Sequence, residues 1–244
     1  MLQARKEYIM IDFKFIVEAF PKILLSVPTA LLMAFAAALL GWILGIGIAL
    51  IRKNKVPVIS QILAVYVSFL RGVPMLILLY IAYYAFPIAL QQYFISIGST
   101  ATVDKIPAVA YAIIALVLEQ SAFSSEIFRA ALSAVDEGQM EAAYSVGMTK
   151  AQALSRIVFP QAMAIAVPNL GGLFVGLIRG TSLAYYVGVY EITATANLLA
   201  MPALNYIEAY IMTTIIYEVL SFIFNRITAV CENRFKRFRA VATA

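Results

Sequence analysis

The sequence predicts an all-α protein that crosses a membrane five times. Apolar residues make up 63% of the 244 residues, and the mean hydropathy is +0.90. Charged residues make up only 13%, against about 25% in an ordinary soluble domain. Segment 23–51 contains no charge and exceeds the roughly 20 apolar residues that a membrane-spanning helix needs. A soluble globule, a disordered chain and a free-standing nucleic-acid binder are therefore poor matches, and we expect membrane lipid rather than nucleic acid around the chain.

The composition also limits the chemistry that the chain can perform. It contains no histidine and a single cysteine, Cys231. An intrachain disulfide, a His-based catalytic triad and a His-liganded metal site are thereby excluded. We expect no catalytic residue, no metal site and no cofactor in this chain.

The N-terminal part combines a short amphipathic segment with the first span. In residues 1–20, apolar side chains such as Ile9, Phe13 and Phe20 alternate with charges, which is typical of an interfacial helix. A frayed tail is the alternative. The first span, 23–51, is too long and lacks the cleavage site expected of a secretory signal.

The second and third spans follow from the next two apolar stretches. Segment 56–103 contains one charge, Arg71, and is long enough for one helix and an apolar loop. Pro87, followed by Gln91 and Gln92, marks the expected exit of the second span. The third span covers about 106–132.

The last part of the chain contains a polar segment and two more spans. Residues 136–156 are polar, 157–178 form the fourth span and 207–229 the fifth. Segment 180–204 has a mixed composition and is expected to be re-entrant or partly helical. These limits divide the chain into an amphipathic segment (1–20), a membrane domain (21–230) and a basic tail (231–244).

The distribution of basic residues predicts the topology. Five spans place the two ends on opposite sides of the membrane. Lys and Arg are more frequent on the side that carries the C-terminus, above all in the cluster Arg234, Lys236, Arg237 and Arg239. By the positive-inside rule the N-terminus lies outside and the C-terminus lies in the cytoplasm.

The segment between the third and fourth spans, 136–160, contains the strongest motif. Acidic residues up to Glu141, followed by Ala142 and Ala143, favour a helix start, where the helix dipole is positive. Gly147 is placed to end this short helix with a left-handed cap, and Pro160 can bend the entry into the fourth span. Such a rigid element can fill a groove on a partner protein and transmit motion. An ordinary helical loop is the alternative.

Over twenty residues this pattern resembles the EAA loop of ABC importer permeases, E-A-A-x3-G-x9-I-x-L-P, with Phe159 in place of the usual Leu. Further stretches resemble the polar amino-acid permeases of that family. Residues 71–74 are similar to R-G-T-P, 83–87 to Y-Y-G-L-P and 125–130 to A-E-I-F-R-G/A. Residues 138–143 match G-Q-x-E-A-A. Arg179-Gly180 replaces the Lys-Asp that precedes T-S-L in the family, and 142–147 and 167–169 are similar to cystine-type permeases.

The resemblance implies the role of the chain and its partners. The chain would be the permease subunit of an importer for polar amino acids, with cystine preferred, in a bacterial cell membrane. It would form a homo- or heterodimer with a second permease subunit, on a dimer of ATPase subunits that bind ATP and Mg. The absence of the phosphate-binding loop G-x-x-x-x-G-K-[ST] agrees with ATP hydrolysis elsewhere. An external binding protein would deliver substrate, and the helix around Glu141, Ala142, Ala143, Gly147 and Pro160 would couple the ATPase to the spans.

Charges inside the spans are candidate site residues, because each costs about 2.5–3.5 kcal/mol on insertion scales. Glu119, with Gln120 beside it, is placed to bind the ammonium group of an amino acid, or alternatively to pair with Arg71 or Arg179. Arg179, with Thr181 and Ser182, is placed to hold a carboxylate, or alternatively to anchor the helix end.

The remaining intramembrane charges are interpreted as structural. Glu126 and Arg129 are three residues apart and share one helix face, so we expect a structural or interhelix ion pair there, with substrate contact as the alternative. Arg71 is expected to play a structural role by bonding to the carbonyls of a partner helix, and a position facing a pore is the alternative. The glycines of the first and fourth spans create small faces for close helix approach, and the fourth-span glycines can alternatively line a pore: Gly41, Gly45, Gly172, Gly176 and Gly180.

Three other functions fit the composition less well. An ion-coupled secondary amino-acid transporter usually contains paired repeats, which are not visible here. An intramembrane enzyme needs a nucleophile–base pair or a metal-ligand cluster. A purely structural subunit would not need intramembrane acids.

Overall fold

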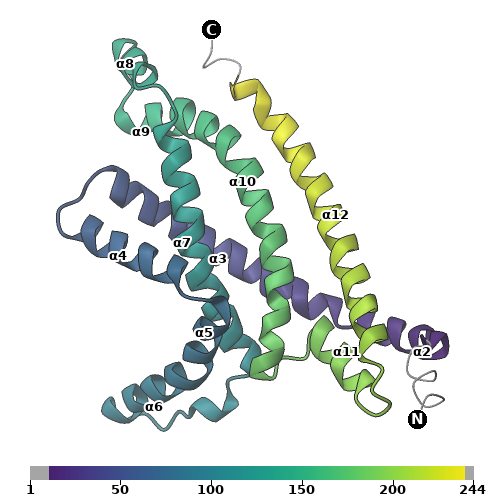
Figure 1. Ribbon diagram of the computed structural model, residues 1–244. Helices are drawn as coiled ribbons and strands as arrows, with labels where there is room; N and C mark the ends of the chain where they lie inside the picture. Colours follow the sequence, from purple (N-terminus) through teal and green to yellow (C-terminus); the bar gives the residue numbers. More distant parts are fainter. Residues whose placement is uncertain (1–10, 240–244) are drawn as a thin grey trace.

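The computed structural model describes residues 11–239, and every regular element in this part of the chain is helical (Figure 1). In chain order these are α2 (Phe13–Leu24), α3 (Val27–Lys53), α4 (Ile59–Gly72), α5 (Met75–Tyr80), the π-helix η1 (Ile81–Ala85), α6 (Phe86–Ser96), the 3₁₀-helix η2 (Val103–Lys105), α7 (Ala108–Ser133), α8 (Gly138–Ser145), α9 (Lys150–Ala153), the π-helix η3 (Leu154–Val158), α10 (Phe159–Gly180), the 3₁₀-helix η4 (Thr181–Val187), α11 (Ile192–Ala200) and α12 (Tyr206–Arg239).

Five helical segments are long and apolar enough to cross a membrane, as the sequence predicts. They are Phe13–Lys53, Met75–Ser96, Ala108–Ser133, Lys150–Val187 and Tyr206–Phe235. Segment 180–204 is partly helical, as expected, because it contains η4 and α11. Of the amphipathic segment 1–20, residues 1–10 lie outside the described part, and α2 begins at Phe13.

The second apolar stretch differs from its prediction. Val73 adopts an extended conformation before Pro74, so α4 ends at Gly72 and a separate helix begins at Met75. A proline lacks the N–H that a helix interior needs and disfavours helical geometry in the residue before it. Pro87 lies in the first turn of α6, and this helix continues past Gln91 and Gln92 to Ser96. The exit of the span at Pro87, Gln91 and Gln92 stays a prediction.

Close helix packing in the core depends on two glycines of α3. A Cβ added at Gly41 would lie 2.6 Å from the Cβ of Gln120, and one added at Gly45 would lie 2.1 Å from the Oγ of Ser124. The packing prediction for these two glycines is confirmed, since both lie against α7. Gly171, which the sequence did not single out, lets α10 approach α12 in the same way, at Thr228.

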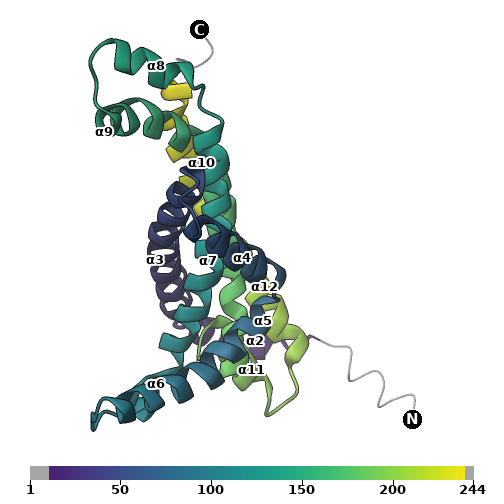
Figure 2. The same cartoon turned by 90° about the vertical axis from the view of Figure 1, so that its left-hand side faces the viewer.

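The elements gather at two ends of the elongated molecule (Figure 1). Helices α8 and α9 and the C-terminal end of α12 lie at one end, and α2, α6 and α11 lie at the other. The turned view shows the same separation (Figure 2). The polar segment and the basic end of α12 are therefore on the same side, as the charge distribution predicts.

Candidate functional site

The short helix α8 has the cap that the sequence predicts. Its first turn is held by the carboxylate of Asp136, whose Oδ1 accepts a hydrogen bond from the N–H of Gly138 at 2.6 Å. The helix ends after Ser145, and Gly147 has a φ of +79°, in the left-handed region. The N–H of Gly147 donates to the carbonyl of Tyr144 (2.9 Å), and the N–H of Met148 donates to that of Ala143 (3.0 Å). These two bonds form the C-terminal motif that favours glycine.

The surface of α8 is suited to contact with a partner. Glu141 and Ala142 are exposed, whereas Ala143 is buried against the rest of the molecule. The side chain of Gln161 in α10 donates to that of Gln139 in α8 at 3.2 Å. The helix is thus fixed to the start of α10 by one side and open on the other.

The return into the fourth span begins with a reciprocal cap. The hydroxyl of Thr149 accepts a hydrogen bond from the N–H of Gln152, and the side chain of Gln152 accepts one from the N–H of Thr149. The chain then passes through η3 into α10, where Pro160 occupies the first turn. Figure 2 shows α9 lying across the long direction that α10 follows, so the change of direction expected near Pro160 is present.

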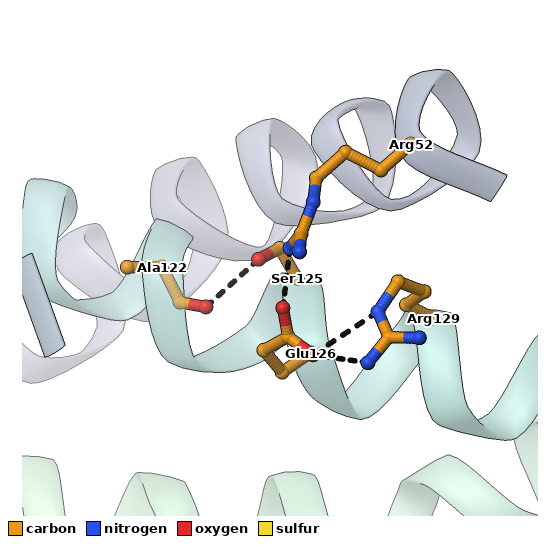
Figure 3. A network of polar contacts seen from close by, with 5 residues as sticks. All are labelled: Arg52, Ala122, Ser125, Glu126 and Arg129. Carbon is orange, nitrogen blue, oxygen red and sulfur yellow. Dashed lines mark hydrogen bonds and ion pairs between the residues drawn. The ribbon is translucent and has the colours of Figure 1, made fainter. Parts of the chain in front are cut away.

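A cluster of charged side chains joins α3 and α7 near this end of the molecule (Figure 3). The carboxylate of Glu126 accepts from Arg129 at 2.6 and 3.1 Å, which confirms the predicted pair. Its other oxygen pairs with the guanidinium of Arg52. The next residue, Lys53, donates to the carbonyl of Leu132 in the last turn of α7. The sequence did not predict this connection of the first span to the end of the third.

Glu119 is half-buried in the middle of α7 and has no hydrogen bond or ion pair within the described residues. The predicted alternative, pairing with Arg71 or Arg179, is therefore not what the structure contains. Arg71 lies over the ring of Phe123, 5.4 Å from its centroid, in keeping with a packing role. Gln120 is buried on the α3 side, and its Oε1 accepts from the indole of Trp42 at 3.4 Å.

The residues around the end of α10 are held by α12 and by their own helix. Arg179 donates to the exposed carboxylate of Glu218 at 3.0 Å and to the buried hydroxyl of Ser221 at 3.0 Å, both in α12. Thr181 is fully buried and donates to the carbonyl of Ile178, and Ser182 is half-buried. No hydrogen bond or ion pair joins this group to Glu119 within residues 11–239.

The fourth-span glycines have open space beside them within residues 11–239. A Cβ added at Gly172, Gly176 or Gly180 would meet nothing within 4 Å, and Gly172 and Gly176 are exposed. Their predicted packing role is therefore not fulfilled by the described part of the chain itself. This face of α10 is open to a second subunit or to a substrate.

A buried carboxylate between the fourth and fifth spans was missed. Glu191 is fully buried, caps α11 by accepting from the N–H of Ala194 (2.9 Å), and accepts from the hydroxyl of Tyr217 in α12 (2.6 Å). Burial raises the pKa of Glu191, and the hydrogen bonds from Tyr217, Thr193 and Ala194 act in the opposite direction. The sequence contains little signal for this cap, because residues 192–196 alternate threonine with apolar residues and Glu is not among the usual N-cap residues.

Comparisons with known proteins agree on one family. Residues 37–237 match the family described as "Binding-protein-dependent transport system inner membrane component". The probable amino-acid permease protein YxeN of Bacillus subtilis is 43% identical over 215 residues, covering 88% of this chain and 92% of YxeN. The L-cystine transport system permease protein TcyL of the same organism is 33% identical, covering 93% and 92%. A crystal structure described as an amino acid ABC transporter with histidines superposes with a TM-score of 0.78 at 29% identity, covering 93% of this chain and 100% of that one.

Proposed function

Since the chain belongs to the family of binding-protein-dependent transport system inner membrane components and is the permease subunit of an amino-acid ABC importer, we propose that it carries cystine in preference to other polar amino acids. The family is one of multi-pass inner-membrane proteins that act with an ATPase and a substrate-binding protein. This membership replaces the alternative of an ion-coupled secondary transporter. The similarity to TcyL and the cystine-like stretches of the sequence support the preference for cystine.

The unpaired charge of Glu119 is the observation that carries the substrate proposal. An ionisable group near the middle of a span costs about 2.5–3.5 kcal/mol on insertion scales, so it normally has a partner. Glu119 has none within residues 11–239, and the substrate ammonium group would supply the missing charge. Cystine carries two ammonium groups, so in a homodimer each could meet the Glu119 of one subunit.

The other candidate residues take supporting roles in this proposal. Arg179 would bind the substrate carboxylate, together with Ser182. To do so, its guanidinium would release the exposed ion pair with Glu218. Gln120 and Thr181 are buried, and they would fix the helices that present Glu119 and Arg179. The uncovered face of Gly172 and Gly176 would lie toward the second permease subunit and the substrate path.

The coupling step belongs to α8. ATP and Mg would bind to the ATPase dimer, and closure of that dimer would carry α8 with it through the exposed surface at Glu141 and Ala142. Because α8 is fixed to α10 and precedes α9, its movement would tilt α10 and open the path to the outside. The N-terminus would lie outside and the C-terminus in the cytoplasm, where the ATPase binds.

Uptake measurements with the complete importer test the substrate proposal. In proteoliposomes that contain the ATPase and are supplied with the binding protein, we expect cystine to compete best in a panel of amino acids. Glu119→Gln should raise the KM for cystine uptake about tenfold, which corresponds to a loss of about 1.4 kcal/mol of binding free energy. Glu119→Asp, which keeps the carboxylate, should raise the KM less. The matched control is Glu18→Gln, which removes an exposed carboxylate in α2. Unchanged uptake by Glu119→Gln, or stronger competition by another amino acid, would contradict the proposal.

A further inference from the structure

An apolar groove lies between helices α3, α10 and α12, away from the residues that the proposed transport function uses. Its volume is about 600 Å³, and its lining is almost entirely apolar. Helices α3 and α12 diverge from the α2 end toward the α8 end, with α10 between them (Figure 1). The hydroxyl of Thr228, one of the few polar groups in the lining, donates to the carbonyl of Phe224 in its own helix. The proton of this hydroxyl is therefore used within α12, and the groove offers few hydrogen-bonding groups to a polar ligand.

The groove lies on the side of α10 away from the face left open by the glycines. Met163, Val167 and Leu170 line the groove, whereas Gly172 and Gly176 are exposed elsewhere. At about 100° per residue, these two sets project from opposite sides of the helix. A second subunit or substrate that covers the glycine face would therefore leave the groove facing the membrane.

The length of the groove matches one leaflet of a bilayer. Along α12 it extends from Phe224 to Phe235, a rise of about 16 Å at 1.5 Å per residue. The hydrocarbon core of a bilayer is about 30 Å thick, so one leaflet contributes about 15 Å. A single acyl chain, running from the middle of the membrane to its surface, would fill this length.

The sequence is strongly basic from Arg234 on, where the groove ends at Phe235. Arg234 and Lys236 flank Phe235, Arg237 and Arg239 follow, and Glu232 is the one acidic residue in 230–239. Helix α12 continues to Arg239, so these residues lie within the last turns beyond the groove. Basic clusters that continue a spanning helix at the membrane surface attract anionic lipid headgroups.

We propose that the groove between α3, α10 and α12 binds one anionic phospholipid, with an acyl chain along Trp42 and Phe235 and its phosphate at the basic end of α12. The apolar lining, the leaflet-matched length and the charge at one end together select this occupant. A zwitterionic lipid would gain the same apolar contacts but less from the basic cluster.

The single tryptophan makes the groove directly measurable, because Trp42 lies in its lining. The full chain is reconstituted in phosphatidylcholine vesicles that contain a small fraction of lipid with brominated acyl chains, which quench tryptophan fluorescence on contact. We expect brominated phosphatidylglycerol to quench Trp42 at least about fivefold more effectively than brominated phosphatidylcholine, the ratio expected for one basic residue at a charged surface.

Two sets of variants separate the parts of the proposal. Combined Arg234→Gln, Arg237→Gln and Arg239→Gln should remove the preference for phosphatidylglycerol, whereas Lys105→Gln, at the other end of the molecule, should keep it. Met163→Phe and, separately, Ile43→Phe should fill the groove and lower quenching by both lipids. Val219→Phe adds the same ring to an exposed position on the opposite side of α12 and should leave quenching unchanged.

Three results would overturn the proposal. Equal quenching of the wild type by the two lipids would remove the headgroup preference, and unchanged quenching in both groove-filling variants would remove the acyl chain from the groove. A disulfide between Cys231 residues of two chains, formed in the assembled importer under mild oxidation, would show that a second copy covers this face.

Discussion

The contact between α3 and α7 depends on the absence of a side chain at single positions. A Cβ at Gly45 would lie 2.1 Å from the Oγ of Ser124 and 3.0 Å from the N of Ser125, whereas a Cβ at Gly47 would meet nothing within 4 Å. We expect Gly45→Val to lower the free energy of unfolding by about 1–3 kcal/mol, as overpacking does, and Gly47→Val to have little effect. Thermal unfolding of the two purified variants checks this. Equal melting temperatures would contradict the close approach seen here.

The carboxylate of Glu126 contributes to stability because two guanidinium groups share it. Its side chain is 20% exposed and that of Arg52 is 16% exposed. Loss of hydrogen bonds to a charged group costs about 1.5–3 kcal/mol, so Glu126→Gln should lower the melting temperature clearly. The control variant Glu18→Gln removes the exposed partner of Lys14. Because exposed ion pairs contribute only about 0–1 kcal/mol, this variant should barely change the melting temperature. If both variants melted alike, the cluster would have no stabilising role.

The sequence predicted the contacts of single residues where both residues lie in the same helix. The spacing of Glu126 and Arg129 within one helix was sufficient to predict their ion pair. The third member, Arg52, is 74 residues away in sequence, and only the packing of α3 on α7 brings it into contact. The same limit applies to Arg179 and Glu218, whose pairing needs the relative rotation of α10 and α12 about their axes.

At the scale of elements, α8 is defined by its cap and by its one open surface. Ala142→Trp places a large side chain on the exposed surface without crowding the core, because Ala142 is exposed and Ala143 is buried. We expect this variant to retain ATP hydrolysis by the complex and to lose most substrate uptake. Gly147→Pro should do the same with a loss of stability, because proline cannot adopt a φ of +79° or donate to Tyr144.

Parallel assays of ATP hydrolysis and uptake in proteoliposomes measure this uncoupling. Ala101→Trp is the matched control, since Ala101 is exposed at the other end of the molecule. Normal uptake per ATP in Ala142→Trp would remove the coupling role of this surface.

The sequence predicts an element well when its signal is contained within the element. Apolar length defined the third span to within about two residues, and Gly147 was enough to predict the end of α8. Proline was ambiguous, because its effect depends on its position in the helix. Pro74 separates α4 from α5, whereas Pro87 lies in the first turn of α6 and leaves that helix intact.

At the scale of the whole molecule, polar and basic segments gather at one end. Helix α8 and the end of α12 lie toward this end, and α2, α6 and α11 lie at the other (Figure 1). The Arg52–Glu126–Arg129 cluster joins the C-terminal parts of α3 and α7. Charge distribution and span count were sufficient to predict this arrangement. The substrate path was not predictable to the same extent, because the face of Gly172 and Gly176 meets no neighbour within the described part of one chain.

The central claim is that an ATPase binds α8, and site-directed photo-cross-linking tests it most directly. The only cysteine is first replaced by Cys231→Ser, and a photoactivatable thiol reagent is then attached at Ala142→Cys or, as a control, at Ala101→Cys. In the assembled importer we predict a cross-link to the ATPase from position 142, with loss of ATP-driven uptake, and none from position 101. A cross-link to the ATPase from position 101 alone would place the ATPase at the end of the molecule opposite to α8 and contradict its binding to α8.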